Sequence, residues 1–237
     1  VQVNGRYDGS SRFPKDDRFA FFPTFSLGWR LSQEKFWKPI AHIVNDFKIR
    51  GSYGLVGSDA FASGAPHFLY QNNIGIGSAH NFWTGLPTSE ISKKGPGFYV
   101  LAVQDAGWEH VKKFDIGFDM MLFNQLNITF DYFHDKRERI LMSRASWPSM
   151  LGYWGSKPWS NIGEVENQGF ELSLNWTKQF GKDLTLDLRG NFTYNQNEYK
   201  YVDEPSYPYV WQTNTGKPLN TVKGYIAEGL FTSEEEI

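Results

Sequence analysis

Residues 170–195, FELSLNWTKQFGKDLTLDLRGNFTYN, contain the pattern that decides the fold. Apolar and polar residues alternate over 170–177 and again over 184–195. Because successive side chains of a β-strand point to opposite faces, each run predicts a strand with one apolar and one polar face. The segment Phe180-Gly181-Lys182-Asp183 between them predicts a tight turn, so the whole stretch predicts an antiparallel hairpin.

Five further segments alternate in the same way, which brings the number of predicted strands to seven. These segments are residues 1–8, 24–31, 47–55, 114–123 and 127–135. Each run has about 8–12 residues, close to the roughly 9–11 that a tilted strand needs to cross a bilayer. The pattern therefore predicts an all-β protein with strands of membrane-spanning length.

The polar face of these strands carries charged residues in mid-strand. They are Asp115, Asp119, Asp131, Glu171, Asp187 and Arg189. A soluble β-sandwich could expose them to water and bury its apolar face against a second sheet. A transmembrane β-barrel would turn them to a wet lumen and its apolar face to lipid. Alternation alone leaves both architectures open.

The lengths of the connections favour the barrel. Residues 123–126 and 180–183 are tight turns, and the link 32–46 at the same end is of moderate length. The connections at the other end, about 57–107, 142–166 and from 198 onward, are long, and one at about 10–20 is shorter. Short periplasmic turns and long extracellular loops are typical of outer-membrane barrels. A sandwich has no reason to segregate its loop lengths in this way.

Composition excludes several other classes of protein. The net charge is −2 and no block of Lys or Arg exists, so a nucleic-acid surface is not supported. Cysteine is absent, which excludes disulfides, thiolate metal sites and cysteine nucleophiles. No run of 18 apolar residues predicts a transmembrane helix. An aromatic content of 17% with a mean hydropathy of −0.49 suits a surface whose apolar and polar faces alternate.

The two ends suggest an internal segment of a larger barrel. The chain opens on the strand-like Val1-Gln2-Val3, without a signal peptide. Seven strands cannot close a bacterial single-chain barrel, in which the strand number is even. At roughly 34 residues per strand, a plugged transporter of about 22 strands would have about 750 residues, of which this chain would be about a third.

Five stretches, in the same order, resemble segments of the SusC/RagA family of TonB-dependent transporters of Bacteroidetes. They are DGSSRF at 8–13, FPTFSLGWR at 22–30, RGSYGLVG at 50–57, NIGEVENQGFEL at 161–172 and GYIAEGLF at 224–231. The fourth differs from the usual family segment by Gln168 in place of Lys. Residues 105–109 depart further, because only Trp108-Glu109 of the family's NLKWE is kept.

The resemblance implies a function for the parent protein. It would import oligosaccharides or peptides across the outer membrane, with a SusD-like surface lipoprotein as lid and TonB as energy source. Residues 1–237 would belong to one TonB-dependent receptor β-barrel domain, without the plug domain and the C-terminal strands. Two alternatives remain: a soluble carbohydrate-binding β-sandwich, and a barrel with a structural role in an envelope assembly.

No residue pattern supports an enzyme, a cofactor or a metal site. The five histidines lack ligand spacing, and no nucleophile or phosphate-binding motif occurs. Asp115 and Asp119 could suggest a glycosidase pair, but they share the polar face of one strand, where solvated charge explains them better.

Aromatic residues gather in the predicted outer loops. Trp147, Tyr153, Trp154 and Trp159 lie in the 142–166 loop, and Trp83 lies in the 57–107 loop. Tyr207, Tyr209 and Trp211 follow in the third loop. These rings could stack on sugars, grip peptide or dock the lid, or they could form small cores of the loops themselves. Trp154 and Trp159 are the first candidates for ligand contact.

Overall fold

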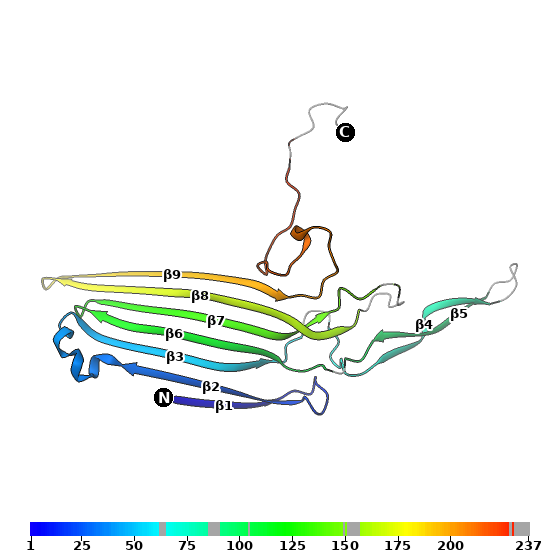
Figure 1. The fold of residues 1–237 in the computed structure, drawn as a ribbon, viewed down its shortest axis with the longest axis horizontal. Helices are drawn as coiled ribbons and strands as arrows, with labels where there is room; N and C mark the ends of the chain where they lie inside the picture. Colours follow the sequence, from blue (N-terminus) through cyan, green and yellow to red (C-terminus); the bar gives the residue numbers. More distant parts are fainter. Residues whose placement is uncertain are drawn as a thin grey trace.

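The computed structural model describes residues 1–61, 65–84, 91–103, 105–148, 150, 157–227 and 229. Seven strands form one antiparallel sheet in the order β1-β2-β3-β6-β7-β8-β9 (Figure 1). They are β1 (Gln2–Gly9), β2 (Phe19–Arg30), β3 (Val44–Ser58), β6 (Glu109–Leu122), β7 (Leu126–Ser143), β8 (Trp159–Phe180) and β9 (Leu184–Tyr201). All seven predicted strands are confirmed.

Several strands continue beyond their predicted limits. β7, β8 and β9 have 18, 22 and 18 residues, and β8 alone extends for about 70 Å. The predicted strand is shorter because apolar and polar residues do not alternate over 161–169, although these residues form the outer part of β8. The loop expected at 142–166 therefore shortens to 144–158.

A second, two-stranded sheet was not predicted. β4 (Asn73–Thr84) and β5 (Ile91–Val100) pair with each other inside the long connection between β3 and β6. Among the strands that the structure describes, neither pairs with the seven-stranded sheet. This hairpin projects beyond the outer end of the sheet (Figure 1).

The opposite end of the sheet is closed by compact connections. The 3₁₀-helices η1 (Leu31–Gln33) and η2 (Lys35–Ile40) link β2 to β3. The β6–β7 turn places Phe123 and Asn124 at φ of 54° and 53°. The β8–β9 turn uses Gly181 at φ of 69°, a left-handed conformation that glycine adopts without a Cβ clash.

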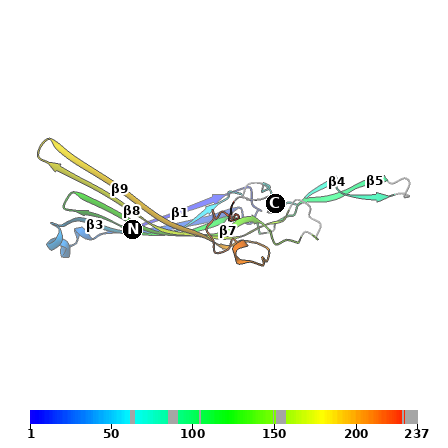
Figure 2. The same ribbon diagram turned by 90° about the horizontal axis from the view of Figure 1, so that it is seen from above.

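The seven-stranded sheet is a single curved layer (Figure 2). In the part of the chain that the structure describes, the only other sheet, β4–β5, lies beyond its end and covers neither face. Large apolar side chains in mid-strand are consequently exposed, such as Phe25 at 52%, Ile116 at 45% and Leu188 at 54%. A sandwich would bury these residues under a second sheet, whereas the sheet described here leaves them exposed, as the barrel prediction requires.

Aromatic rings connect neighbouring strands on the apolar face. Phe118 lies between Phe47 and Phe130, with ring centroids 5.8 and 5.6 Å away. The ladder continues from Phe130 to Phe170 at 6.1 Å and from Phe170 to Phe192 at 5.7 Å. Such cross-strand aromatic pairs stabilise a sheet and hold its register.

The buried core is small and lies under the outer loops. One cluster contains Phe13, Phe22 and Trp108, and a second contains Leu69, Val103, Ala106 and Leu141. Phe13 and Trp108 have ring centroids 5.3 Å apart, and Phe22 meets Trp108 edge-on at 5.4 Å. These contacts fold the loops onto the outer end of the sheet.

Candidate functional site: a polar wall and aromatic outer loops

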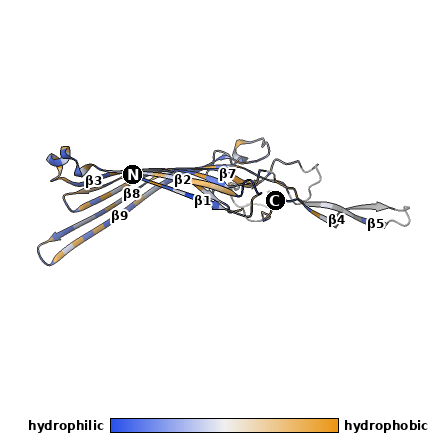
Figure 3. Ribbon diagram, turned by 90° about the horizontal axis from the view of Figure 1, so that it is seen from below, coloured by the Kyte–Doolittle hydropathy of each residue, from blue (hydrophilic) through white to orange (hydrophobic). Residues whose placement is uncertain are grey.

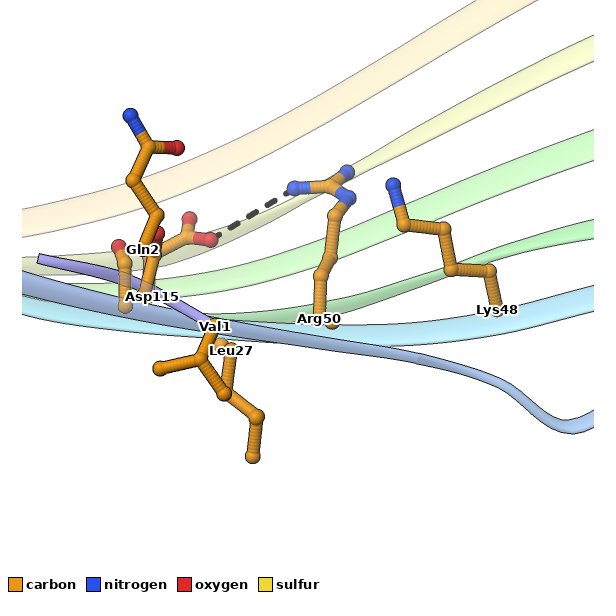
Figure 4. Close-up of a pocket in the computed structure, with 10 residues that line it drawn as sticks. Val1, Gln2, Leu27, Lys48, Arg50 and Asp115 are labelled. Carbon is orange, nitrogen blue, oxygen red and sulfur yellow. Dashed lines mark ion pairs between the residues drawn. The ribbon is translucent and has the colours of Figure 1, made fainter.

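The two faces of the sheet have opposite chemistry. Hydrophobic and hydrophilic residues alternate along the strands (Figure 3). In the hollow that β1, β2, β3 and β6 form, Lys48, Arg50 and Asp115 point to one side, whereas Val1 and Leu27 point to the other (Figure 4). The polar side is the wall that the barrel prediction turns toward a water-filled lumen.

Arg50 is the centre of the polar wall. Two of its guanidinium nitrogens lie 2.6 Å from the two carboxylate oxygens of Asp131. Asp119 and Asp115 lie 3.4 and 3.6 Å from the same guanidinium. Three carboxylates therefore surround one cation, which leaves a surplus of negative charge on this part of the wall.

Glycine at position 117 makes this cluster possible. Arg50 lies on β3 and Asp131 on β7, and both pair with Gly117 of the intervening β6. A Cβ at Gly117 would overlap the Asp131 carboxylate and the Phe130 carbonyl oxygen. The missing side chain lets Arg50 reach across β6 and form a bidentate ion pair, the strongest geometry for this pair.

The cluster explains the predicted pair Asp115 and Asp119. Arg50 lies against both carboxylates, and Thr129 donates a hydrogen bond from its hydroxyl to Asp119 at 3.2 Å. The two carboxylates are thus part of a charged, hydrated wall. In the described part of the chain, no group of three or more His, Asp and Glu residues could hold a metal ion.

The apolar face ends along one line at the outer side. Tyr132, Phe170 and Tyr194 are aligned across β7, β8 and β9. The next outward-facing row, two residues along each strand, is His134, Gln168 and Gln196. Aromatic residues at such a boundary are typical of the membrane–water interface. From Phe170 to Phe180, β8 extends for about 33 Å, which a tilt of about 45° reduces to near the roughly 25 Å of an outer-membrane apolar band.

Ion pairs replace apolar residues above this line. Lys112 and Lys136 lie 2.6 and 2.7 Å from Glu138, which joins β6 to β7. Lys200 lies 2.6 Å from Glu166, which joins β9 to β8. The outward face is therefore polar where the strands leave the apolar band.

Two aromatic residues predicted as ligand contacts lie in described parts of the outer loops. Trp147 is half-buried in the loop 144–158. Trp159 is the first residue of β8 and packs against the cluster of Leu69, Val103, Ala106 and Leu141.

The other three predicted contacts are not placed. Trp83 belongs to β4, but its side chain lies outside the described residues. Tyr153 and Trp154 lie outside them altogether. The described part of the chain therefore shows the side chains of Trp147 and Trp159 alone among the five predicted rings.

A buried carboxylate that sequence reasoning missed joins two outer loops. Asp203 has only 5% of its side chain exposed and accepts hydrogen bonds from the Ser146 amide and hydroxyl at 2.9 and 2.8 Å. Arg144 lies 3.3 Å away. Burial raises the pKa of Asp203, but the Ser146 donors and Arg144 outweigh it, so the pKa lies below its usual value. No local sequence motif predicts this contact, because Ser146 and Asp203 are 57 positions apart.

Among the described residues, no helix is long and apolar enough to span a membrane.

Comparison with known proteins agrees with this architecture. The family model described as "TonB dependent receptor-like, beta-barrel" matches residues 1–232. TonB-dependent receptor P39 of Formosa agariphila is 30% identical over 238 residues, covering 99% of this chain and 21% of the relative. TonB-dependent receptor SusC of Bacteroides thetaiotaomicron is 30% identical over 205 residues, covering 81% and 18%.

A solved structure has the same fold. The chain matches the RagAB peptide importer in its closed-closed state with a TM-score of 0.64 and 23% identity, covering 83% of this chain and 20% of the other. The chain spans about a fifth of the length of the curated relatives that it matches.

Proposed function

The chain belongs to the SusC/RagA group of the TonB-dependent receptor β-barrel family, in the outer membrane, and on this premise we propose that it forms part of the wall and outer mouth of a nutrient importer. The observation that carries this proposal is the two-faced single sheet, with a charged wall around Arg50 on one side and exposed apolar residues on the other. Such a sheet separates lipid from a hydrated lumen.

The strands described here supply about a third of the proposed barrel. β1 and β9 are the edges of the sheet, and unpaired edges are unstable in lipid. We propose that strands from the rest of the parent protein pair with both edges, in a barrel of about 22 strands. A plug domain inside the lumen and a segment that contacts TonB complete the importer.

The proposed cargo is an oligosaccharide or a peptide. RagAB, which shares the fold, is described as a peptide importer, which supports peptide. The aromatic outer loops support oligosaccharide, because flat rings offer stacking surfaces. Trp154, Tyr153, Trp147 and Trp83 are proposed contacts of cargo or lid. Trp159 is proposed as a weaker contact, since it also packs against a loop core.

A SusD-like surface lipoprotein is the proposed lid, and the β4–β5 hairpin is its proposed contact. An isolated two-stranded hairpin is marginally stable in water. This one nevertheless continues for 12 and 10 residues beyond the wall (Figure 1). A protein surface against the hairpin would supply the missing burial.

The test uses a strain in which the gene for the full-length parent is deleted and then restored. Labelled oligosaccharides and peptides are offered, and uptake is measured with and without a protonophore. We expect uptake of at least one class to require the gene and to stop when the proton motive force is dissipated. Uptake that survives the protonophore would indicate passive diffusion, and unchanged uptake after deletion would favour a structural role in the envelope.

A further inference from the structure

The segment after β9 folds back onto that strand. Residues 202–221 return so that Tyr199 donates its amide to the Lys217 carbonyl at 3.0 Å, and Gly216 donates to the Tyr199 carbonyl at 2.7 Å. The Leu219 amide donates to the Asn197 side chain at 2.9 Å. This loop is therefore held to the outer end of the wall by backbone hydrogen bonds (Figure 1).

Charged side chains hold the interior of the loop. The Glu204 carboxylate accepts hydrogen bonds from the amides of Asn214 and Thr215 at 2.8 and 3.0 Å. The Lys217 ammonium donates to the carbonyls of Val210 and Trp211 at 3.2 and 2.7 Å. Both charged groups are thus directed into the loop's own backbone.

Two aromatic rings stand on this fixed support. Tyr209 and Trp211 flank Val210 on the 3₁₀-turn η4 (Val210–Gln212), with ring centroids 5.9 Å apart and ring planes at 15°. Tyr209 is 59% exposed and Trp211 is 63% exposed. The rings are nearly parallel and open to solvent, whereas Trp159 at the start of β8 packs against a core.

The surroundings of the rings indicate the chemistry of a ligand. Tyr209, Val210 and Trp211 form a contiguous exposed apolar patch, and such patches mark sites of interaction with a ligand or partner. The nearby Lys217 and Glu204 are engaged inside the loop, so they do not select a charged ligand by ion pairing. A neutral pyranose ring fits, since its C–H face packs on an aromatic ring while its hydroxyls remain hydrated.

We propose that Tyr209 and Trp211 form a stacking platform for a sugar ring of a neutral oligosaccharide at the outer mouth. This inference rests on the proposed import function and deepens it, because it favours oligosaccharide over peptide as the cargo.

The test is binding to the detergent-purified full-length parent protein. The probes are a panel of neutral hexasaccharides of glucose, xylose, mannose and N-acetylglucosamine, with a panel of hexapeptides beside them. We expect at least one hexasaccharide to bind, and the double variant Tyr209→Ala/Trp211→Ala to bind it at least about tenfold more weakly. Trp211→Phe keeps a flat ring and should retain most of the affinity.

Phe36→Ala is the matched control. Phe36 is an equally exposed aromatic residue, at 60%, on η2 at the opposite end of the sheet, so its removal should leave binding unchanged. Heat-modifiable migration on gels confirms that each variant is a folded barrel.

The other outcomes would contradict the platform, the chemistry of its ligand or the import function, as follows. Unchanged oligosaccharide affinity in the double variant overturns the platform. Peptide binding that the double variant weakens, without oligosaccharide binding, overturns the ligand chemistry and leaves import intact. No binding by either panel overturns the platform as well. The purified protein could bind an oligosaccharide through Tyr209 and Trp211 while cells that carry the gene fail to take up that sugar. This pair of results would support the platform and contradict import.

Discussion

Single residues decide which side chains of the polar wall can contact each other across an intervening strand. Gly117 separates Arg50 from Asp131, and the Arg50–Asp131 pair exists because no side chain stands between them. Three strands away, on the apolar face of β9, a Cβ added at Gly190 would meet nothing within 4 Å. The same chemical change at these two positions should therefore have different consequences.

Gly117→Ala is expected to destabilise the folded barrel by about 1–3 kcal/mol, because the added methyl group meets a backbone carbonyl that cannot move without disturbing β7. Urea titration of the full-length protein in detergent, followed by heat-modifiable migration, measures the change. Gly190→Ala is the control and should shift the midpoint little. Equal midpoints for both variants would contradict the close approach at Gly117.

Asp203 provides a second prediction at this scale. Its folded pKa is below the unfolded value, so its contribution to loop anchoring is fully present above the unfolded pKa of about 3.9. The contribution is lost as the pH falls through the folded pKa. Hydrogen exchange at Ser146, corrected for intrinsic rates, should stay slow from pH 7 to about pH 4.5 and accelerate only below about pH 4.

Asp203→Asn should make exchange at Ser146 fast and largely independent of pH, because the amide cannot offer two charged acceptor oxygens to the Ser146 amide and hydroxyl. Asp183→Asn, in the exposed turn at the other end, is the control and should leave Ser146 protected. Protection at Ser146 that is the same in wild type and Asp203→Asn would show that the loop is held by other contacts.

At the scale of the strand, the alternation assigns each residue to lipid or to lumen. Leu174 faces outward with 39% exposure, between Phe170 and Phe180, whereas its neighbour Ser173 faces the polar wall. We expect Leu174→Arg to destabilise the barrel in lipid vesicles by about 2–4 kcal/mol, the cost of a cation at the bilayer midplane. Ser173→Arg is the matched control, and it should fold nearly as well as wild type.

Folded yield in vesicles, compared between the two variants, checks this assignment. If Ser173→Arg were the more damaging change, the faces would be reversed. If both were tolerated, β8 would not span the bilayer at this position.

The same strands show how far the sequence predicts the fold. Over 170–177 and 184–195, alternation is a local property of consecutive residues, so both strands could be read directly. Over 161–169 apolar and polar residues do not alternate, so the apolar signal disappears although the strand continues. β4 begins with the glycine-rich Asn-Ile-Gly-Ile-Gly, and glycine is depleted in strands, so the sequence predicts a loop there.

The site was less predictable because its contacts are distant in sequence. Arg50 and Asp131 are 81 residues apart, and Ser146 and Asp203 are 57 apart. Sequence pattern places these residues on a face or in a loop, but only the register of the folded sheet brings them together. The aromatic residues at 147–159 could be assigned to a loop by composition, but their partners could not.

At the scale of the whole molecule, the wall and the hairpin are structurally separable. The Ala102 amide donates to the Asn72 side chain at 2.8 Å, and Asn73 pairs with Val100, so the hairpin begins and ends at nearly one point. A short Gly-Ser linker can therefore replace residues 73–100 in the full-length protein without stretching the chain. The seven-stranded sheet does not include β4 or β5, and it should remain folded.

We expect this hairpin deletion to preserve heat-modifiable migration and to reduce copurification of the SusD-like lipoprotein by at least about tenfold, because the proposed contact surface is removed. Quantitative mass spectrometry of affinity-purified complexes measures the ratio of lipoprotein to barrel. Replacing Gly181-Lys182-Asp183 with Asn-Gly-Asp at the other end of the sheet is the control. Lipoprotein that copurifies at the wild-type ratio would place the lid contact elsewhere on the outer loops, whereas loss of the folded barrel would show that the hairpin supports the wall.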